Sequence, residues 1–209
     1  MPSVSPGFVN KARSVLLLVV LAGLGTGCGG PARVPAPVYD PEGMARAAMV
    51  DYDKNGDGKL DAAELEACPA LKNALLHIGE RKRAYLTEEE IADRLRQFQE
   101  SKVGLSSIRC RVFRDGVGLA GVTVTFVPEG FMGGAIKPGS GISDKNGNVA
   151  LKMDGETVDG LGLGFYRAEA SLKDASGKET LPAQYNKSTK LGFEVNHGKM
   201  EIFQINIES

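Results

Sequence analysis

The chain has 209 residues, 42% of them hydrophobic and 24% charged, which suits one or two small folded domains. Its formal net charge is -1, so the charge balance gives no indication of nucleic-acid binding. The few His and Cys residues do not occur at the spacing of a four-ligand zinc site, which argues against zinc-finger proteins.

The N-terminal residues have the pattern of an export signal. Lys11 and Arg13 precede an apolar run over residues 15–24, and no acidic residue occurs before Asp40. The run is too short to cross a bilayer, which takes about twenty apolar residues, but it has the length of a signal-peptide core. We therefore predict a signal peptide over residues 1–27 and an exported protein.

Small residues immediately before Cys28 resemble the lipobox of bacterial lipoproteins. In that family the cysteine is acylated and becomes the new N-terminus, which implies an anchor in the cell envelope, on its periplasmic or extracellular face. Gly25 stands where the family usually has Leu, so an ordinary signal peptide cut near Gly27 is the alternative. Residues 28–42 are rich in Gly and Pro and predict a flexible tether.

Residues 53–64 fit the twelve-residue calcium loop of the EF-hand family, which they resemble strongly. Calcium takes about six to eight oxygen ligands, and the alternating acidic and amide side chains of the loop supply them. Gly58 permits the sharp turn, and Leu60 points inward to a core. The predicted ligands are the side chains of Asp53, Asn55, Asp57, Asp61 and Glu64 and the backbone carbonyl of Lys59. An acidic, solvated turn is the alternative.

The flanking residues predict helices on both sides of the loop. Asp40 can cap a helix that starts at Pro41, and Leu65 and Cys68 continue an apolar face after the loop. The resemblance implies an EF-hand-like helical domain over residues 43–103.

A second, degenerate unit follows over residues 79–90, with Leu86 placed to pair with Leu60. Arg81 and Arg83 stand where calcium needs anions, so we expect no second calcium ion. The basic run over residues 80–83 could hold phosphate or an acidic partner, but we expect a solvated surface. Thr87 with Glu90 forms a capping box before the next helix.

From about residue 104 the apolar pattern changes to period two. Short alternating segments, separated by Gly-containing turns, predict an all-β sandwich of about seven strands over residues 104–209. We expect its last two segments, residues 191–195 and 202–207, to form a hairpin. Asp144 and Asn146 are expected to make a turn and no metal site.

Residues 119–124, 143–147 and 164–168 resemble the carboxypeptidase regulatory-like domain, a transthyretin-type sandwich. That family is a non-catalytic module of exported proteins. The predicted fold class is therefore α+β in two domains, an EF-hand-like helix–loop–helix pair followed by the β-sandwich.

His77 and His197 have no nucleophile near them in a recognised pattern, so we expect no enzyme and no catalytic residue. The expected function is a calcium-binding, membrane-anchored structural or adhesion module of the cell envelope. The alternative is a calcium-responsive protein that binds a glycan or another envelope protein. Calcium is the expected cofactor; the expected partners are the membrane, through the N-terminal lipid, and an envelope protein or glycan, with no nucleic acid.

Cys68 and Cys110 are the two cysteines that remain if Cys28 is acylated. Export would allow a disulfide between them, which would staple the two predicted domains. Both also occupy apolar-face positions, and we favour the alternative that each is a small buried core residue.

Overall fold

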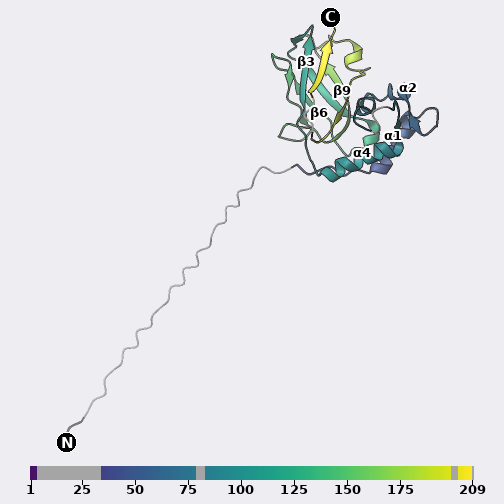
Figure 1. Ribbon diagram of the computed structural model, residues 1–209. Coiled ribbons are helices and arrows are strands. Elements are labelled where there is room, and N and C mark those ends of the chain that lie inside the picture. The colour runs from purple at the N-terminus through teal and green to yellow at the C-terminus, as the bar shows by residue number, and fades with distance from the viewer. Residues whose placement is uncertain (4–33, 79–82, 199–201, 209) are drawn as a thin grey trace. The chain divides into compact units, whose positions relative to one another are not determined.

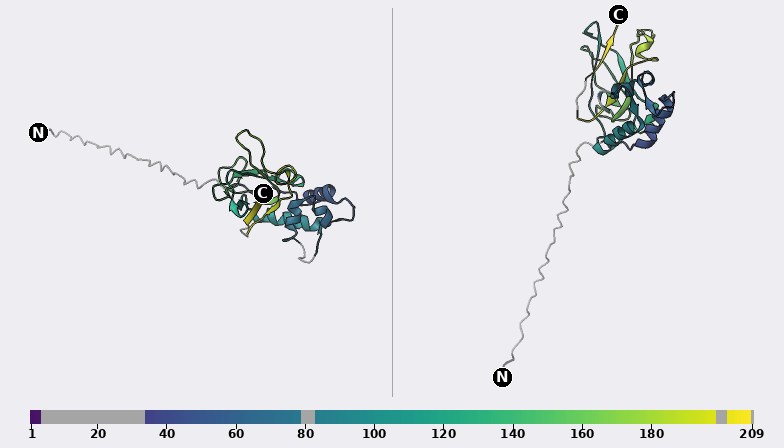
Figure 2. Two further views of the ribbon diagram at one scale, coloured as in Figure 1. Left: turned by 90° about the horizontal axis from the view of Figure 1, so that it is seen from above. Right: turned by 45° about the vertical axis from the view of Figure 1, so that its right-hand side comes forward.

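The computed structural model describes residues 1–3, 34–78, 83–198 and 202–208. Residues Arg33–Ser209 form one compact unit (Figures 1 and 2). Most of the predicted signal peptide and tether, including Cys28, lies outside the described residues. No helix among the described residues is both long enough and apolar enough to cross a membrane.

The first part of the compact unit holds the α-helices. They are α1 (Pro41–Tyr52), α2 (Ala62–Leu65), α3 (Pro69–Ala74) and α4 (Glu88–Ser101). Asp40 caps α1, with its carboxylate accepting the Gly43 N–H at 3.1 Å, and Thr87 and Glu90 form the capping box of α4, as predicted. The apolar stripe of α4 is buried. Local capping chemistry therefore sets where α1 and α4 start.

The described residues also form eleven strands and two short 3-10 helices, η1 (Gly130–Met132) and η2 (Ala183–Tyr185). The strands are β1 (Lys59–Leu60), β2 (Leu86–Thr87), β3 (Arg109–Arg114), β4 (Val117–Gly118), β5 (Thr123–Pro128), β6 (Gly139–Ile142), β7 (Asn148–Val149), β8 (Lys152–Met153), β9 (Gly164–Ser171), β10 (Gly192–Val195) and β11 (Ile202–Ile207).

These strands form three sheets. A small one pairs β1 with β2, a five-stranded sheet has the order β10-β9-β5-β6-β8, and a four-stranded sheet has the order β11-β3-β4 with β7 also paired to β3. The last strand, β11, runs parallel to β3, whereas β10 pairs with β9. The predicted hairpin of residues 191–195 and 202–207 is therefore wrong, because its two strands belong to different sheets.

The two larger sheets pack face to face through aromatic rings. Phe203 of the four-stranded sheet lies 5.3 Å from Phe126 and 5.0 Å from Phe193, between ring centroids, and the latter two belong to the five-stranded sheet. All three side chains are buried. This aromatic contact joins the sheets into one β region, residues 109–208.

The helices cover part of the outer side of the five-stranded sheet. Glu194 on β10 is fully buried there and pairs with Arg94 on α4 at 2.5 Å. Gly192 on the same strand lies directly against α3, because an added Cβ would come within 2.0 Å of the Pro69 carbonyl carbon. Helix α3 can approach β10 this closely only because residue 192 has no side chain.

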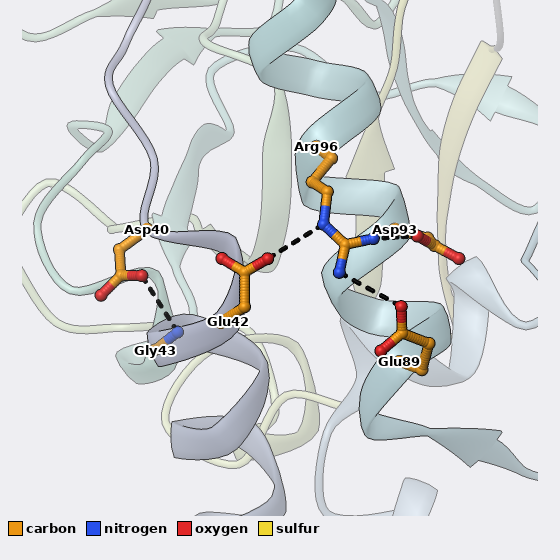
Figure 3. Close-up of polar contacts among 6 residues, drawn as sticks. All are labelled: Asp40, Glu42, Gly43, Glu89, Asp93 and Arg96. Atoms are coloured by element: carbon orange, nitrogen blue, oxygen red, sulfur yellow. Dashed lines mark hydrogen bonds and ion pairs between the residues drawn. The ribbon is translucent and has the colours of Figure 1, made fainter.

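A polar contact joins α1 to α4 at the surface (Figure 3). Arg96 on α4 donates to Glu42 on α1 at 3.0 Å, and on its own helix it pairs with Glu89 at 3.2 Å and with Asp93. One guanidinium thus bridges two carboxylates of its own helix and one of the neighbouring helix. Figure 1 shows α1 and α4 side by side against the β region.

The predicted fold class is wrong. The protein is mostly β, with three sheets and short helices, and the loop of residues 53–64 is not followed by the second helix of an EF-hand pair. Pro69 explains the difference, because the residue before a proline avoids helical geometry, and Cys68 accordingly has φ -125° and ψ 82°. The helix after the loop therefore stops at Leu65, and a separate helix restarts at Pro69 and packs on β10.

Candidate metal site

The segment from Asp53 to Glu64 forms a tight loop at the end of α1. The Asp53 N–H still donates to the Met49 carbonyl at 2.8 Å, but its backbone has left the helical region, with ψ 92°. Gly56 and Gly58 both have positive φ, 73° and 79°. A side chain at either position would strain the backbone, so the two glycines fix the path of the loop.

Side chains in the first half of the loop accept hydrogen bonds from the loop backbone. Asp53 accepts the N–H groups of Gly56 at 2.7 Å and Gly58 at 2.9 Å. Asn55 Oδ1 accepts the Asp57 N–H at 2.9 Å, and Asp57 Oδ1 accepts the Lys59 N–H at 2.9 Å. The first three predicted side-chain ligands are therefore oriented by the loop itself.

Glu64 closes the loop from its far end. Its Oε1 accepts the N–H groups of Lys54 at 2.8 Å and Asn55 at 3.2 Å, and its Oε2 accepts that of Asp61 at 3.0 Å. Asp61 caps α2 in return, so the two residues form a capping box. Glu64 is only 9% exposed. Its carboxylate thus brings the twelfth residue back to the first turn of the loop.

A two-stranded ladder holds the middle of the loop. Leu60 pairs with Leu86, as predicted, and both side chains are fully buried. Lys59 pairs with Thr87, and its ammonium lies 4.9 Å from the ring centroid of Tyr85. In the basic run over residues 80–83, the structure describes only Arg83, which pairs with Glu90. Residues 79–82 lie outside the described part.

The donor chemistry of the loop suits calcium, because its carboxylate, amide and carbonyl oxygens are hard ligands. Over the described residues, however, no group of three or more His, Cys, Asp or Glu side chains forms a set that could hold a metal ion. The acidic side chains here are arranged around N–H groups of the loop. A complete calcium site would also use the Asn55 amide and the Lys59 carbonyl.

A buried acid that was not predicted from the sequence, Glu129, connects the loop to the β region. Tyr52, the residue before Asp53, donates to Glu129 at 3.4 Å, and its ring meets Phe131 edge-on at 6.4 Å between centroids. Glu129 is 3% exposed, and burial raises the pKa of its carboxyl. No local pattern around Glu129 signals this role, because the contact spans 77 residues of sequence.

Cys68 and Cys110 are free and buried in the structure, with no disulfide between them. Burial raises the pKa of each thiol to about 12. Cys110 therefore packs as a small apolar residue. The Cys68 thiol is also buried, but it hydrogen-bonds with Tyr52 and Glu129.

Asp144 and Asn146 lie in a turn, as predicted. Asp144 Oδ1 accepts the N–H groups of Asn146 at 2.8 Å and Asn148 at 2.9 Å. Gly147, with φ 80°, completes the turn.

Comparison with known proteins provides no family for this chain. No protein-family model matches it, and neither a curated protein nor a solved structure gives a match. Its function must therefore be argued from its own residues.

Proposed function

We propose that this protein is an exported, lipid-anchored, non-catalytic component of the cell envelope whose loop from Asp53 to Glu64 binds one calcium ion. The ion has a structural role: it stabilises the contact between the helices and the β region.

The observation that carries the proposal is the closure of the loop by Glu64. Its carboxylate returns to the backbone of Lys54 and Asn55, which brings it to the same turn as Asp53. Four acidic side chains fall within this one short loop. Their mutual repulsion disfavours the closed loop, and a divalent cation offsets that repulsion.

The contacts of Tyr52 give the site its structural role. Tyr52 ends α1 directly before the first predicted ligand, and it contacts both Glu129 and Phe131 of the β region. An ion that orders Asp53 would also restrain Tyr52. Calcium would thereby stabilise the interface between α1 and η1.

Calorimetry tests the calcium site directly. The mature chain, stripped with a chelator, is titrated with calcium, and one ion per chain is expected, with a dissociation constant on the order of 10⁻⁵ to 10⁻³ M. Two sites, or no heat of binding in this range, would reject the proposal.

Dye binding separates the structural role from the alternative calcium-responsive role. A structural ion orders the chain, so the fluorescence of a hydrophobic-surface dye should fall or stay level when calcium is added. A rise in fluorescence would indicate that calcium opens an apolar surface and would favour the responsive protein.

Membrane fractionation tests the anchor. The lipid anchor is inferred from the sequence around Cys28 alone, because that residue lies outside the described part of the chain. Cys28→Ser is expected to release the protein from membranes or to leave an uncleaved precursor. Mass spectrometry of the mature protein that shows an unmodified N-terminus at another residue would exclude lipidation.

A further inference from the structure

The arginines of β3 differ from the other described arginines. Every described arginine outside β3 pairs with a carboxylate, and these residues are Arg46, Arg83, Arg94, Arg96 and Arg167. Arg109, Arg111 and Arg114 form no ion pair with any residue in the described part of the chain. In a protein with a net charge of -1, one strand thus carries a local excess of positive charge.

Two of these arginines line a surface groove. The groove has a volume of about 470 Å³ and lies where β3, β7 and β11 meet. Arg109, Arg111 and Asn148 supply its polar side chains, and both charges among the described lining residues are positive. A volume of this order is typical of sites that bind small ligands.

Within the described part of the chain, Arg111 is held in place by an aromatic ring and not by a polar side chain. Its guanidinium lies 4.6 Å from the ring centroid of Phe113, and stacking of this kind orients the planar group. Its Nε is buried and donates to no acceptor among the described residues. A buried donor without an acceptor is uncommon in folded proteins, and an oxyanion on a ligand would satisfy it.

Aliphatic side chains form the rest of the groove. Ile108, Val149 and Ile202 lie beside the two arginines, and the Ile202 side chain is half exposed. A ligand that fits would therefore carry an oxyanion close to an aliphatic group. We propose that this groove binds an acidic peptide segment of a partner protein, with an aspartate or glutamate on the arginines and an aliphatic side chain beside them.

The shape and chemistry of the groove favour a peptide over other anionic partners. A flat membrane surface would meet exposed arginines but would not enter a concave site. A sugar chain is usually held by aromatic platforms, whereas the walls here are aliphatic. The Asn148 amide nitrogen donates to Asp144 at 3.2 Å, and its amide oxygen offers an acceptor that a peptide N–H can pair with.

Nuclear magnetic resonance of the isotope-labelled mature chain tests this proposal. The probe is a blocked peptide that alternates leucine and aspartate, and matched peptides carry asparagine or lysine in place of aspartate. We expect the aspartate peptide to shift the backbone amide signals of Arg109, Arg111 and Asn148, and higher salt to weaken this binding. The titration is run with calcium and with chelator, because the groove does not depend on the proposed calcium site.

Matched variants show which charge matters. Arg111→Gln and Arg109→Gln should each weaken peptide binding by about tenfold to a hundredfold, as the loss of a charge-assisted hydrogen bond does. Arg46→Gln removes the same charge from an exposed arginine that already pairs with Glu88, and it should leave binding unchanged. Thermal melting confirms that each variant folds.

Three results would overturn the proposal. One is equal binding of the lysine peptide. Another is unchanged affinity in both β3 variants. The third is an acidic oligosaccharide or an anionic vesicle that shifts the groove signals when the peptide does not.

Discussion

The tetrapeptide Asp-Lys-Asn-Gly occurs twice in this chain, at residues 53–56 and at residues 144–147, and it serves two different structures. In both copies the aspartate accepts N–H groups from residues later in its own turn. The local fold of the two segments is therefore similar. The residues after each tetrapeptide decide whether the turn can become part of a metal site.

The first copy continues into further oxygen donors, whereas the second continues into a strand. After Gly56 come Asp57, Asp61 and Glu64, and the last of these returns to the start of the loop. After Gly147 the chain enters β7, which pairs with β3. Asp144 accepts hydrogen bonds from the N–H groups of its own turn. Those of Asn148 and Asn146 hold the pKa of its carboxyl below the usual value. A turn motif alone is therefore not a metal site.

Glu64→Gln tests the comparison most strongly. The change replaces an anion that can bind through both oxygens by a neutral amide, so calcium affinity should fall on the order of a hundredfold or more. Calorimetry with calcium measures the loss. The matched control is Asp144→Asn in the second copy, for which calcium affinity should change by less than about twofold.

The comparison would break if Asp144→Asn weakened calcium binding as much as Glu64→Gln. It would also break if Glu64→Gln bound calcium as tightly as the natural protein. In either case the carboxylates of the first loop would serve only their own backbone N–H groups.

Calcium removal should lower the melting temperature. At a calcium concentration a hundred times the dissociation constant, binding to the folded state stabilises it by about 2.7 kcal/mol. For a protein of this size that corresponds to roughly 5–10 °C. Differential scanning calorimetry with calcium and with chelator measures the shift, and for Glu64→Gln the shift should fall to less than about 2 °C.

Local chemistry made the loop, its caps and its ladder predictable from the sequence. Asp40, Thr87 and Glu90 act within one helical turn of their partners, and the pairing of Leu60 with Leu86 is predicted by the position of each in its loop. These contacts need little information beyond a short window of sequence. The loop, the helix caps and the ladder are therefore the features of the helical region that could be predicted from the sequence.

The arrangement of the larger elements depended on contacts between distant residues. The parallel pairing of β11 with β3 and the contact of Tyr52 with Glu129 have no short-range signature. Pro69 is a local signal for the end of α2, and the prediction from the EF-hand pattern did not include it. The predicted EF-hand-like helix pair therefore failed, because the apolar faces of the helices pack against the five-stranded sheet.

Gly192→Ala tests that helix–sheet contact. The new methyl group would lie 2.0 Å from the carbonyl carbon of Pro69 and 2.2 Å from the Ala70 nitrogen, so α3 must move away from β10. Overpacking of this kind costs about 1–3 kcal/mol of unfolding free energy, which urea denaturation measures. Gly130→Ala is the matched control, because an added Cβ there meets nothing within 4 Å. Equal stability of the two variants would show that α3 is not held against β10.

Glu129→Gln should have the smallest effect, and one that depends on pH. Burial raises the pKa of this carboxyl above its usual value of 4.5, although Arg167 opposes the shift and Tyr52 and Cys68 hydrogen-bond to it. The folded protein thus holds this proton more tightly than the unfolded chain does. The natural protein therefore loses stability as pH rises through the interval between the two pKa values.

Glutamine cannot titrate, yet its amide oxygen can still accept the Tyr52 hydroxyl. The variant should therefore match the natural protein at about pH 4 and gain melting temperature relative to it as pH rises toward about 8. Other groups titrate in both proteins and cancel in the difference. Melting curves between about pH 4 and pH 8, at a fixed calcium concentration, measure this difference in melting temperature. A difference in melting temperature that stays constant with pH would mean that Glu129 keeps an ordinary pKa. A difference of the opposite sign would mean that Arg167 lowers the pKa of Glu129 by more than burial raises it.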